Sequence, residues 1–194
     1  MELCIIFLSH HPCLSLKKLG ILNKEEEVLF MVKIESGQGG KEVIVEENPL
    51  SRWLFSNTRS AWIWLILRLY LGYNWLVAGW GKITSPAWTG EDAGVAVEGF
   101  MNGAIALAKE GDVAGWYAWF LETVVIPNSV LFSYMVAWGE FLVGLGLIVG
   151  LLTGIAAFFG ALMNMSFLLA GTVSSNPVMF IIALLLILAW KVAG

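Results

Sequence analysis

Charged side chains are scarce in this sequence. Only 13% of its 194 residues are Asp, Glu, Lys or Arg, whereas 58% are hydrophobic. A soluble globular protein usually carries about 25% charged residues. The composition therefore excludes an ordinary soluble domain and favours a chain that lies in lipid.

Cysteine and histidine are absent from residues 14–194, because Cys4, Cys13, His10 and His11 all lie near the start of the chain. Thiolates and imidazoles are the usual protein ligands of iron–sulfur clusters, haem and copper. We therefore predict no metal site and no protein-ligated cofactor in the hydrophobic part of the chain. Electrons that pass through this part would need another carrier.

Clustered positive charge is missing as well. The chain has 11 Lys and Arg against 15 Asp and Glu, which gives a net charge of −4. Proteins that bind phosphate backbones carry a basic patch or stripe, and none is visible here. A nucleic-acid partner is therefore not expected.

Long stretches almost free of charge make up most of the chain. Between residues 61 and 81 the one ionic residue is Arg68, and between 130 and 190 it is Glu140. At about 20 apolar residues per membrane-spanning helix, these stretches hold one helix and three helices. The predicted spans are residues 61–81, 130–150, 153–172 and a fourth beginning at Asn176-Pro177. The predicted fold class is all-α: a polytopic membrane protein with a four-transmembrane-helix bundle.

The remaining segments divide the chain into two predicted parts. Residues 1–60 form a polar N-terminal arm with an interfacial helix near its end, and residues 61–194 form the membrane domain. Between the first two spans, residues 83–128 make a long outer loop with interfacial helices over 91–109 and 116–126. Pro127-Asn128-Ser129 is expected to end this loop and cap the second span.

The first thirty residues differ from the rest. The run Lys24-Glu25-Glu26-Glu27 lies shortly before Met31. Codons for Lys-Glu-Glu can contain the core sequence of a prokaryotic ribosome-binding site, so translation would then start near Leu29 or Met31. Residues 1–30 are thus either an untranslated extension or a genuine charged cytoplasmic tail. Residues 31–49, which are polar and rich in glycine, are expected to be loosely ordered.

The orientation follows from the basic residues near the span ends. Arg52, Arg59 and Lys191 fall on one side, and Lys82 and Lys109 on the other. The positive-inside rule then places both termini in the cytoplasm and the long loop outside. The expected location is the plasma membrane of a prokaryote.

Arg68 and Glu140 are the candidate catalytic residues. A charge in the middle of a bilayer costs at least ~2.5 kcal/mol, so it normally faces a partner inside the bundle. Arg68 lies roughly 10 Å and Glu140 roughly 15 Å from the inner ends of their spans. We therefore predict an Arg68–Glu140 ion pair, which either locks two helices together or holds a ligand or a proton. Alternatively, Arg68 reaches the inner interface.

Three further residues are candidates for substrate or quinone binding: Lys82, Trp75 and Asn164. Lys82 either anchors the span at the interface or attracts an anion at the mouth of the bundle. Asn164 either hydrogen-bonds across a helix interface or contacts a ligand. Trp75 belongs to an aromatic belt that anchors the protein or stacks on a planar quinone.

An ordered set of motifs connects these residues: Arg68-x-x-x-Gly72, Gly79-x-x-Lys82, Trp88, Gly139-Glu140-x-x-x-Gly144, Gly150-Leu151-Leu152-Thr153, Met163-Asn164 and Asn176-Pro177. In this order, and with the long loop, the chain resembles the DoxX/DoxD family of small membrane proteins over roughly residues 60–192. The loop is most similar to that of the DoxD branch.

The resemblance implies a four-span bundle that is a membrane subunit of a thiosulfate:quinone oxidoreductase or a related redox complex. Membrane quinone would be the electron acceptor. The alternative is a non-catalytic anchor for a soluble redox or oxidative-stress enzyme, so whether the chain is itself an enzyme is left open. The expected partners are the lipid bilayer, a second small membrane subunit or a soluble redox enzyme, and further copies of the chain.

Overall fold

The computed structural model of the protein describes residues 32–34, 43–45 and 48–194. These residues belong to two compact units that divide between Arg52 and Trp53. The prediction about the translation of residues 1–30 lies outside the described residues.

The N-terminal unit contains a short β-hairpin, where the sequence predicted loose order. Strand β1 (Val32–Ile34) pairs antiparallel with β2 (Val43–Val45), and Val32 lies opposite Val45. β-Branched valine and isoleucine favour this extended conformation. Helix α1 (Pro49–Ser56) follows and confirms a short helix before the first span.

The unit from Trp53 onward consists of helices joined by short turns. Its long elements are α2 (Ala61–Ile83), α4 (Val95–Glu110), α6 (Ser129–Val149), α7 (Thr153–Leu169) and α8 (Asn176–Leu188); its short ones are α3 (Pro86–Thr89), α5 (Gly115–Phe120) and α9 (Trp190–Ala193). By length and composition, the helical stretches Thr58–Ile83 and Gly115–Val149 are able to cross a membrane, and α7 and α8 are shorter apolar helices. Apolar helices therefore lie where all four spans were predicted.

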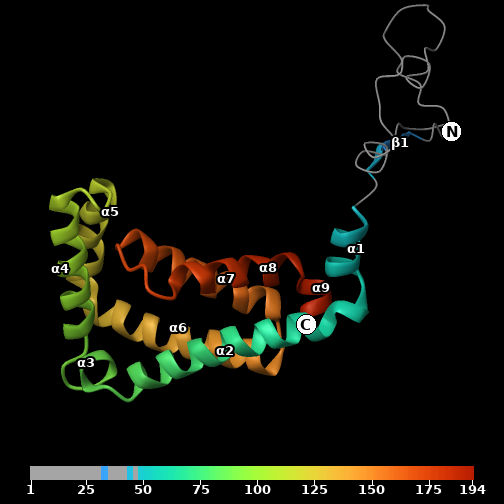
Figure 1. Ribbon diagram of the computed structural model, residues 1–194. Helices are drawn as coiled ribbons and strands as arrows, with labels where there is room; N and C mark the ends of the chain where they lie inside the picture. The colour runs from blue at the N-terminus through green and yellow to red at the C-terminus, as the bar shows by residue number, and fades with distance from the viewer. Residues whose placement is uncertain (1–31, 35–42, 46–47) are drawn as a thin grey trace, which may run out of the picture. The chain divides into compact units, whose positions relative to one another are not determined.

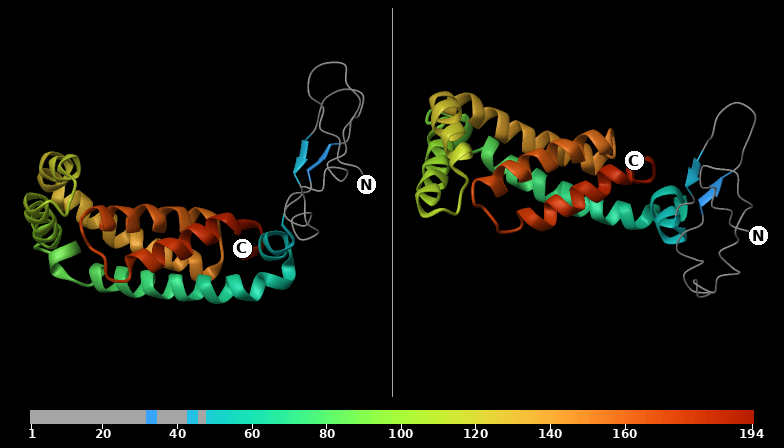
Figure 2. Two further views of the ribbon diagram at one scale, coloured as in Figure 1. Left: turned by 45° about the horizontal axis from the view of Figure 1, so that its top comes forward. Right: turned by 90° about the horizontal axis from the view of Figure 1, so that it is seen from above.

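Helices α2, α6, α7 and α8 run side by side, and α3, α4 and α5 lie at one end of them (Figure 1). The views in Figure 2 show the same arrangement, with the C-terminus at the opposite end of the four helices. The most extensive packing between helices is that of α2 against α6. The predicted outer loop is therefore a helical cap on one end of the bundle.

Two separate hydrophobic cores hold this unit together. The bundle core is formed by side chains from α2, α6, α7 and α8, including Trp64, Leu71, Trp75, Leu147 and Leu186. The cap core lies between α4, the α5 region and the end of α7, and includes Val97, Ala104, Tyr117, Leu121 and Val125. Tyr117 also joins the cap to α7, because its hydroxyl donates a hydrogen bond to the Ser166 carbonyl oxygen at 2.9 Å.

The outer faces of the bundle helices are apolar too. Exposed large hydrophobic residues occur on all four of them, including Trp62, Ile66, Leu142, Leu162 and Ile181. Soluble monomers rarely leave large apolar patches uncovered. This is the surface expected of helices surrounded by lipid.

The segment before the second apolar helix differs from its prediction. Instead of ending at Pro127-Asn128-Ser129, helical structure is continuous from Gly115 to Val149. Only the winding changes, to a π turn over Leu121–Val125 and a 3₁₀ turn over Ile126–Asn128. Proline lacks an N–H and disrupts an α-helical hydrogen bond, and the altered winding accommodates it. The predicted start of the second span is confirmed, since α6 begins at Ser129 with Asn128 as its N-cap residue. The predicted separation from the preceding helical segment is wrong.

Candidate functional site

The site is built on the close approach of α2 and α6. A Cβ atom added to Gly79 would collide with the backbone of Phe141, and one added to Gly144 would collide with the backbone of Leu76. Since each glycine admits the backbone of the facing helix, these contacts determine the register of the antiparallel pair. Gly79 lies level with Glu140 and Phe141.

This register brings Lys82 to Glu140. The Lys82 ammonium nitrogen Nζ lies 2.6 Å from Glu140 Oε2 and donates a hydrogen bond to it. Helical side chains lean toward the N-terminus of their helix, so Lys82 reaches back toward the level of Gly79. Its Nζ also lies 5.1 Å from the centre of the Trp88 ring on α3, within cation–π range. A counter-charge and an aromatic face thus accompany the buried carboxylate.

The predicted Arg68–Glu140 ion pair is wrong. Arg68 precedes Gly79, which is level with Glu140, by 79 − 68 = 11 residues, or about 16 Å along the helix. The prediction assumed that the inner ends of the two spans are level. In the structure, Gly150 at the end of α6 lies beside Arg68, whereas α2 begins at Ala61, seven residues before Arg68. The start of α2 therefore extends beyond the end of α6.

Arg68 has other partners at its own end of the bundle. Its Nη1 donates a hydrogen bond to the Ala193 carbonyl oxygen at 2.7 Å, and its guanidinium lies against Gly150. These are C-terminal ends of helices, where free carbonyl groups carry partial negative charge. Arg68 therefore ties the C-terminal segment to α2 and α6, and its part in any chemistry stays a prediction.

We expect Arg68→Gln to lower the free energy of unfolding by about 1–3 kcal/mol, because it removes a charged hydrogen-bond donor and leaves the Ala193 carbonyl oxygen without its hydrogen bond. Thermal unfolding in mild detergent measures this. Ligand affinity at the Glu140 end should not change, since the two sites lie far apart. A variant with normal stability but impaired ligand binding would contradict this assignment.

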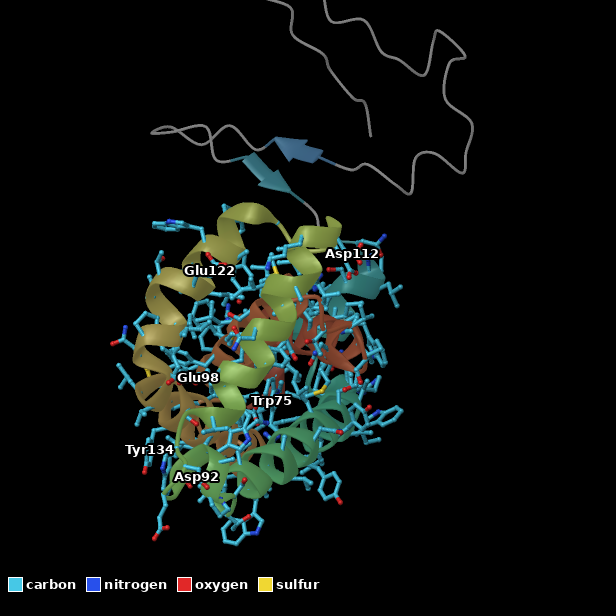
Figure 3. The ribbon with its side chains drawn as sticks, turned by 90° about the vertical axis from the view of Figure 1, so that its left-hand side faces the viewer. Trp75, Asp92, Glu98, Asp112, Glu122 and Tyr134 are labelled. Carbon is cyan, nitrogen blue, oxygen red and sulfur yellow. The ribbon has the colours of Figure 1, made fainter. Side chains whose placement is uncertain are left out.

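A cavity of about 430 Å³ lies beside the Lys82–Glu140 pair. Its walls come from α2, α3, α4, α6, α7 and α8. The aromatic side chains that line it are Trp75, Trp88, Phe100 and Phe167. Figure 3 looks onto this end of the bundle, with α4 in front and Trp75 among the helices behind it. The cavity thus combines a charged pair with aromatic walls.

Two buried side chains with polar atoms lie in the bundle core near this level: Trp75, which lines the cavity, and Asn164, which does not. Trp75 is 2% exposed and Asn164 fully buried. In the part of the chain that the structure describes, neither the indole nitrogen of Trp75 nor either amide atom of Asn164 has a hydrogen-bond partner. An unsatisfied buried polar group costs about 1–3 kcal/mol.

The surroundings place these two side chains close together. A Cβ on Gly160 of α7 would lie 3.1 Å from the Trp75 indole nitrogen, and the Phe167 ring centre lies 6.5 Å from that of Trp75. Asn164 follows Gly160 by four residues and precedes Phe167 by three, so all three share one face of α7. That face packs on Trp75.

The structure thus gathers Lys82, Glu140 and Trp75 around one cavity and leaves Arg68 at the other end. Asn164 lies on the face of α7 that packs on Trp75 and does not line the cavity. Trp88 and Phe100 were not among the predicted site residues. Their aromatic character was visible in the sequence, but only the docking of α3 and α4 onto the bundle brings them to the cavity.

The cap around the cavity is acidic. Lys109 is the one basic residue among residues 83–128, against six acidic ones: Glu91, Asp92, Glu98, Glu110, Asp112 and Glu122. Four of these, Asp92, Glu98, Asp112 and Glu122, are labelled across this end in Figure 3. An excess of one charge raises the local concentration of oppositely charged ligands and repels like ones. The cap therefore disfavours the approach of anions.

Comparison with known proteins identifies one relationship. A family model described as DoxX matches residues 63–174, more than half of the chain. The match begins in α2 and ends just before α8, so it covers Glu140, Lys82, Trp75 and Asn164. No curated protein and no solved structure matches the chain.

Proposed function

This chain belongs to the DoxX family of membrane proteins, and from that premise we propose that it is a membrane subunit of a sulfur-compound (thiosulfate):quinone oxidoreductase. In this proposal the cavity beside Glu140 binds the head group of membrane quinone. The observation that carries it is a cavity of about 430 Å³ with aromatic walls and a buried ion pair, formed between apolar helices.

The proposed topology has four membrane spans, α2, α6, α7 and α8. With 17 residues, α7 is about 25 Å long, somewhat less than the ~30 Å hydrocarbon core. A span shorter than the bilayer is accommodated by local thinning. Four antiparallel spans leave both ends of the bundle unit on one side, where Arg59 and Lys191 favour the cytoplasm.

The charges around the cavity favour an uncharged ligand. Lys82 is already paired with Glu140, so their formal charges cancel. The acidic cap repels a dianion such as thiosulfate. Quinone and quinol are neutral, and their rings suit the aromatic walls. We therefore assign the quinone to this cavity and the oxidation of the sulfur anion to a partner subunit.

The ion pair would serve the proton side of the reaction. A quinone that accepts two electrons takes up two protons to become a quinol. Ionisable groups inside a membrane protein commonly bind substrate or relay protons. Lys82 is a hydrogen-bond donor for a carbonyl oxygen, and the Glu140 carboxyl group is able to hold a proton next to it. The electrons would come from the partner subunit.

Native membranes from a deletion strain test this function. We expect thiosulfate-dependent quinone reduction to be lost in the deletion strain and restored when the full chain is expressed again. Membranes retain any partner subunit, so the assay does not require the partner to be known. Equal activity with and without the chain would contradict the proposal.

A non-catalytic anchor for a soluble redox enzyme is the second candidate. It is favoured by the exposed Trp116 and Trp119, 64% and 63% accessible, which lie on the acidic cap. Exposed aromatic residues are typical of protein-binding surfaces as well as of membrane interfaces. An anchor would keep its role when the Lys82–Glu140 pair is replaced by apolar residues, whereas a quinone site would lose its activity.

A further inference from the structure

The cavity beside the Lys82–Glu140 pair is open on one side of the bundle. The residues that line it include buried ones, such as Trp75 and Met179, and the exposed Ser175 in the turn between α7 and α8. Buried side chains therefore form its inner wall, and the turn before α8 lies at its edge. The opening at this edge is the mouth of the cavity.

The opposite rim of the mouth is one face of α2. Asn74, Ala78 and Lys82 all line the cavity, and all three are partly exposed. They recur every four residues, so they lie one above the other along the helix. A Cβ added to Gly81, seven residues after Asn74 and on the same face, meets no atom within 4 Å. This face of α2 thus has open space beside it.

Little holds the two rims together. Helix α2 packs far more extensively on α6 than on α8. Among the described residues, no hydrogen bond or ion pair joins α2 to the α7–α8 turn or to α8. The Asn176 amide at the start of α8 donates instead to the Thr172 carbonyl oxygen of its own turn, at 2.9 Å. The mouth is therefore a seam between α2 and the start of α8.

In the proposed topology this seam faces the bilayer, because α2 and α8 are both membrane spans. Val77 and Val178 are the chain neighbours of two lining residues, Ala78 and Met179, and both valines are exposed. Exposed valine is the expected residue type where a span meets lipid. A ligand that reaches the mouth therefore arrives from an apolar phase.

Asn74 is a polar residue at this mouth. It lies 83 − 74 = 9 residues before Ile83, the last residue of α2, or about 14 Å from the end of the span. A polar group at such a depth is costly in lipid and normally faces a cavity or a partner. Its Nδ2 donates to the Tyr70 carbonyl oxygen at 2.8 Å, and within the described part of the chain Oδ1 accepts no hydrogen bond. Asn74 thus gives the mouth an acceptor for a polar group that passes along it.

We propose that the cavity takes its ligand sideways from the bilayer, through the mouth between α2 and the start of α8. The ligand class is a neutral ring with a long alkyl chain. The ring lies at the Lys82–Glu140 pair, and the chain extends past Ala78 into lipid. Since the chain stays in lipid while the ring enters, no apolar surface of it has to be exposed to water. This inference rests on the proposed quinone function and adds the route of entry and the residues that border it.

Photo-crosslinking of the full chain in phosphatidylcholine vesicles tests the route. The probe is a trimethylbenzoquinone whose decyl chain carries a diazirine near the ring, and the same quinone without the diazirine, in excess, is the competitor. Mass spectrometry should find competed labels on α2 around Ala78 and on the first turn of α8. Competed labels that leave either rim unlabelled would overturn this inference and leave quinone binding intact. No competed label anywhere would mean that the quinone does not bind, which would overturn the proposed function and this inference together.

A matched pair of variants gives an independent readout. In Ala78→Phe a ring would occupy the mouth, and the affinity for the decyl quinone in isothermal titration should fall about tenfold or more. Val77→Phe adds the same side chain at an exposed position about 100° away around the helix, so it should bind like the wild type. Equal affinities of the two variants, with thermal unfolding showing both to be folded, would overturn the inference. If Ala78→Phe does not fold, the labelling of the wild type decides.

Discussion

Lys82→Met is expected to destabilise the protein by about 3 kcal/mol and to abolish quinone reduction. The Glu140 side chain is 2% exposed, and without Lys82 its carboxylate would be buried without a counter-charge. Removing one partner of a buried ion pair typically costs about 3–5 kcal/mol, and partial exposure of Lys82 places this case at the lower end. Thermal unfolding in mild detergent and the membrane assay measure the two effects.

Two related variants distinguish a role of the Lys82–Glu140 pair in stability from a role in quinone reduction. Glu140→Gln should cost less, about 1 kcal/mol, because the Lys82 side chain is 22% exposed and its ammonium is able to turn toward water. In the double variant Lys82→Met/Glu140→Leu, stability should return to near the wild-type value, since no unpaired charge remains. Its quinone reduction should stay absent. Restored activity in the double variant would show that the pair serves only to hold α2 against α6.

Gly79→Ala is expected to destabilise the bundle by about 3 kcal/mol. The new Cβ would meet backbone atoms of Phe141 and Glu140, which are part of a helix and have no freedom to rotate away. Overpacking in a close-packed interior costs about 1–3 kcal/mol, and a collision with backbone lies at the upper end of this range. Thermal unfolding measures the loss.

Gly81→Ala is the matched control in the same helix. No atom lies within 4 Å of a Cβ added at Gly81. Alanine has a higher helix propensity than glycine by about 1 kcal/mol, so this variant should be as stable as the wild type or slightly more stable. Similar stability losses in both variants would contradict the assigned α2–α6 contact.

The positions of the apolar helices were predictable because they depend on local composition. A run of about 20 residues with a single charge is helical in lipid whichever helices surround it. Asn176-Pro177 likewise marked the start of α8 correctly, since proline is favoured at the first turn of a helix. Pro127 carried a similar signal for the start of α6 at Ser129, but it lies in a 3₁₀ turn that follows a π turn, so the chain is helical on both sides of it.

The partner of Glu140 was not predictable in the same way. Arg68 and Lys82 lie four residues before Gly72 and three residues after Gly79, so both share the face of α2 on which these glycines meet α6, and either was compatible with the sequence. The choice depends on how far α2 slides along α6, which is determined by contacts such as those of Gly79 and Gly144 across the interface. Arg68 and Lys82 lie nearly four helical turns apart, or about 21 Å along α2, and no single helix contains the information that chooses between them.

By itself, the sequence determined the helical class, the family and the places where apolar helices begin and end. Each of these follows from residues close together in the chain. Only the tertiary structure decided that Lys82, not Arg68, pairs with Glu140, and that α4 and Trp75 line the same cavity. These are contacts between residues far apart in sequence, and they result from the packing of whole helix surfaces, which determines the register between α2 and α6 and the position of the cap.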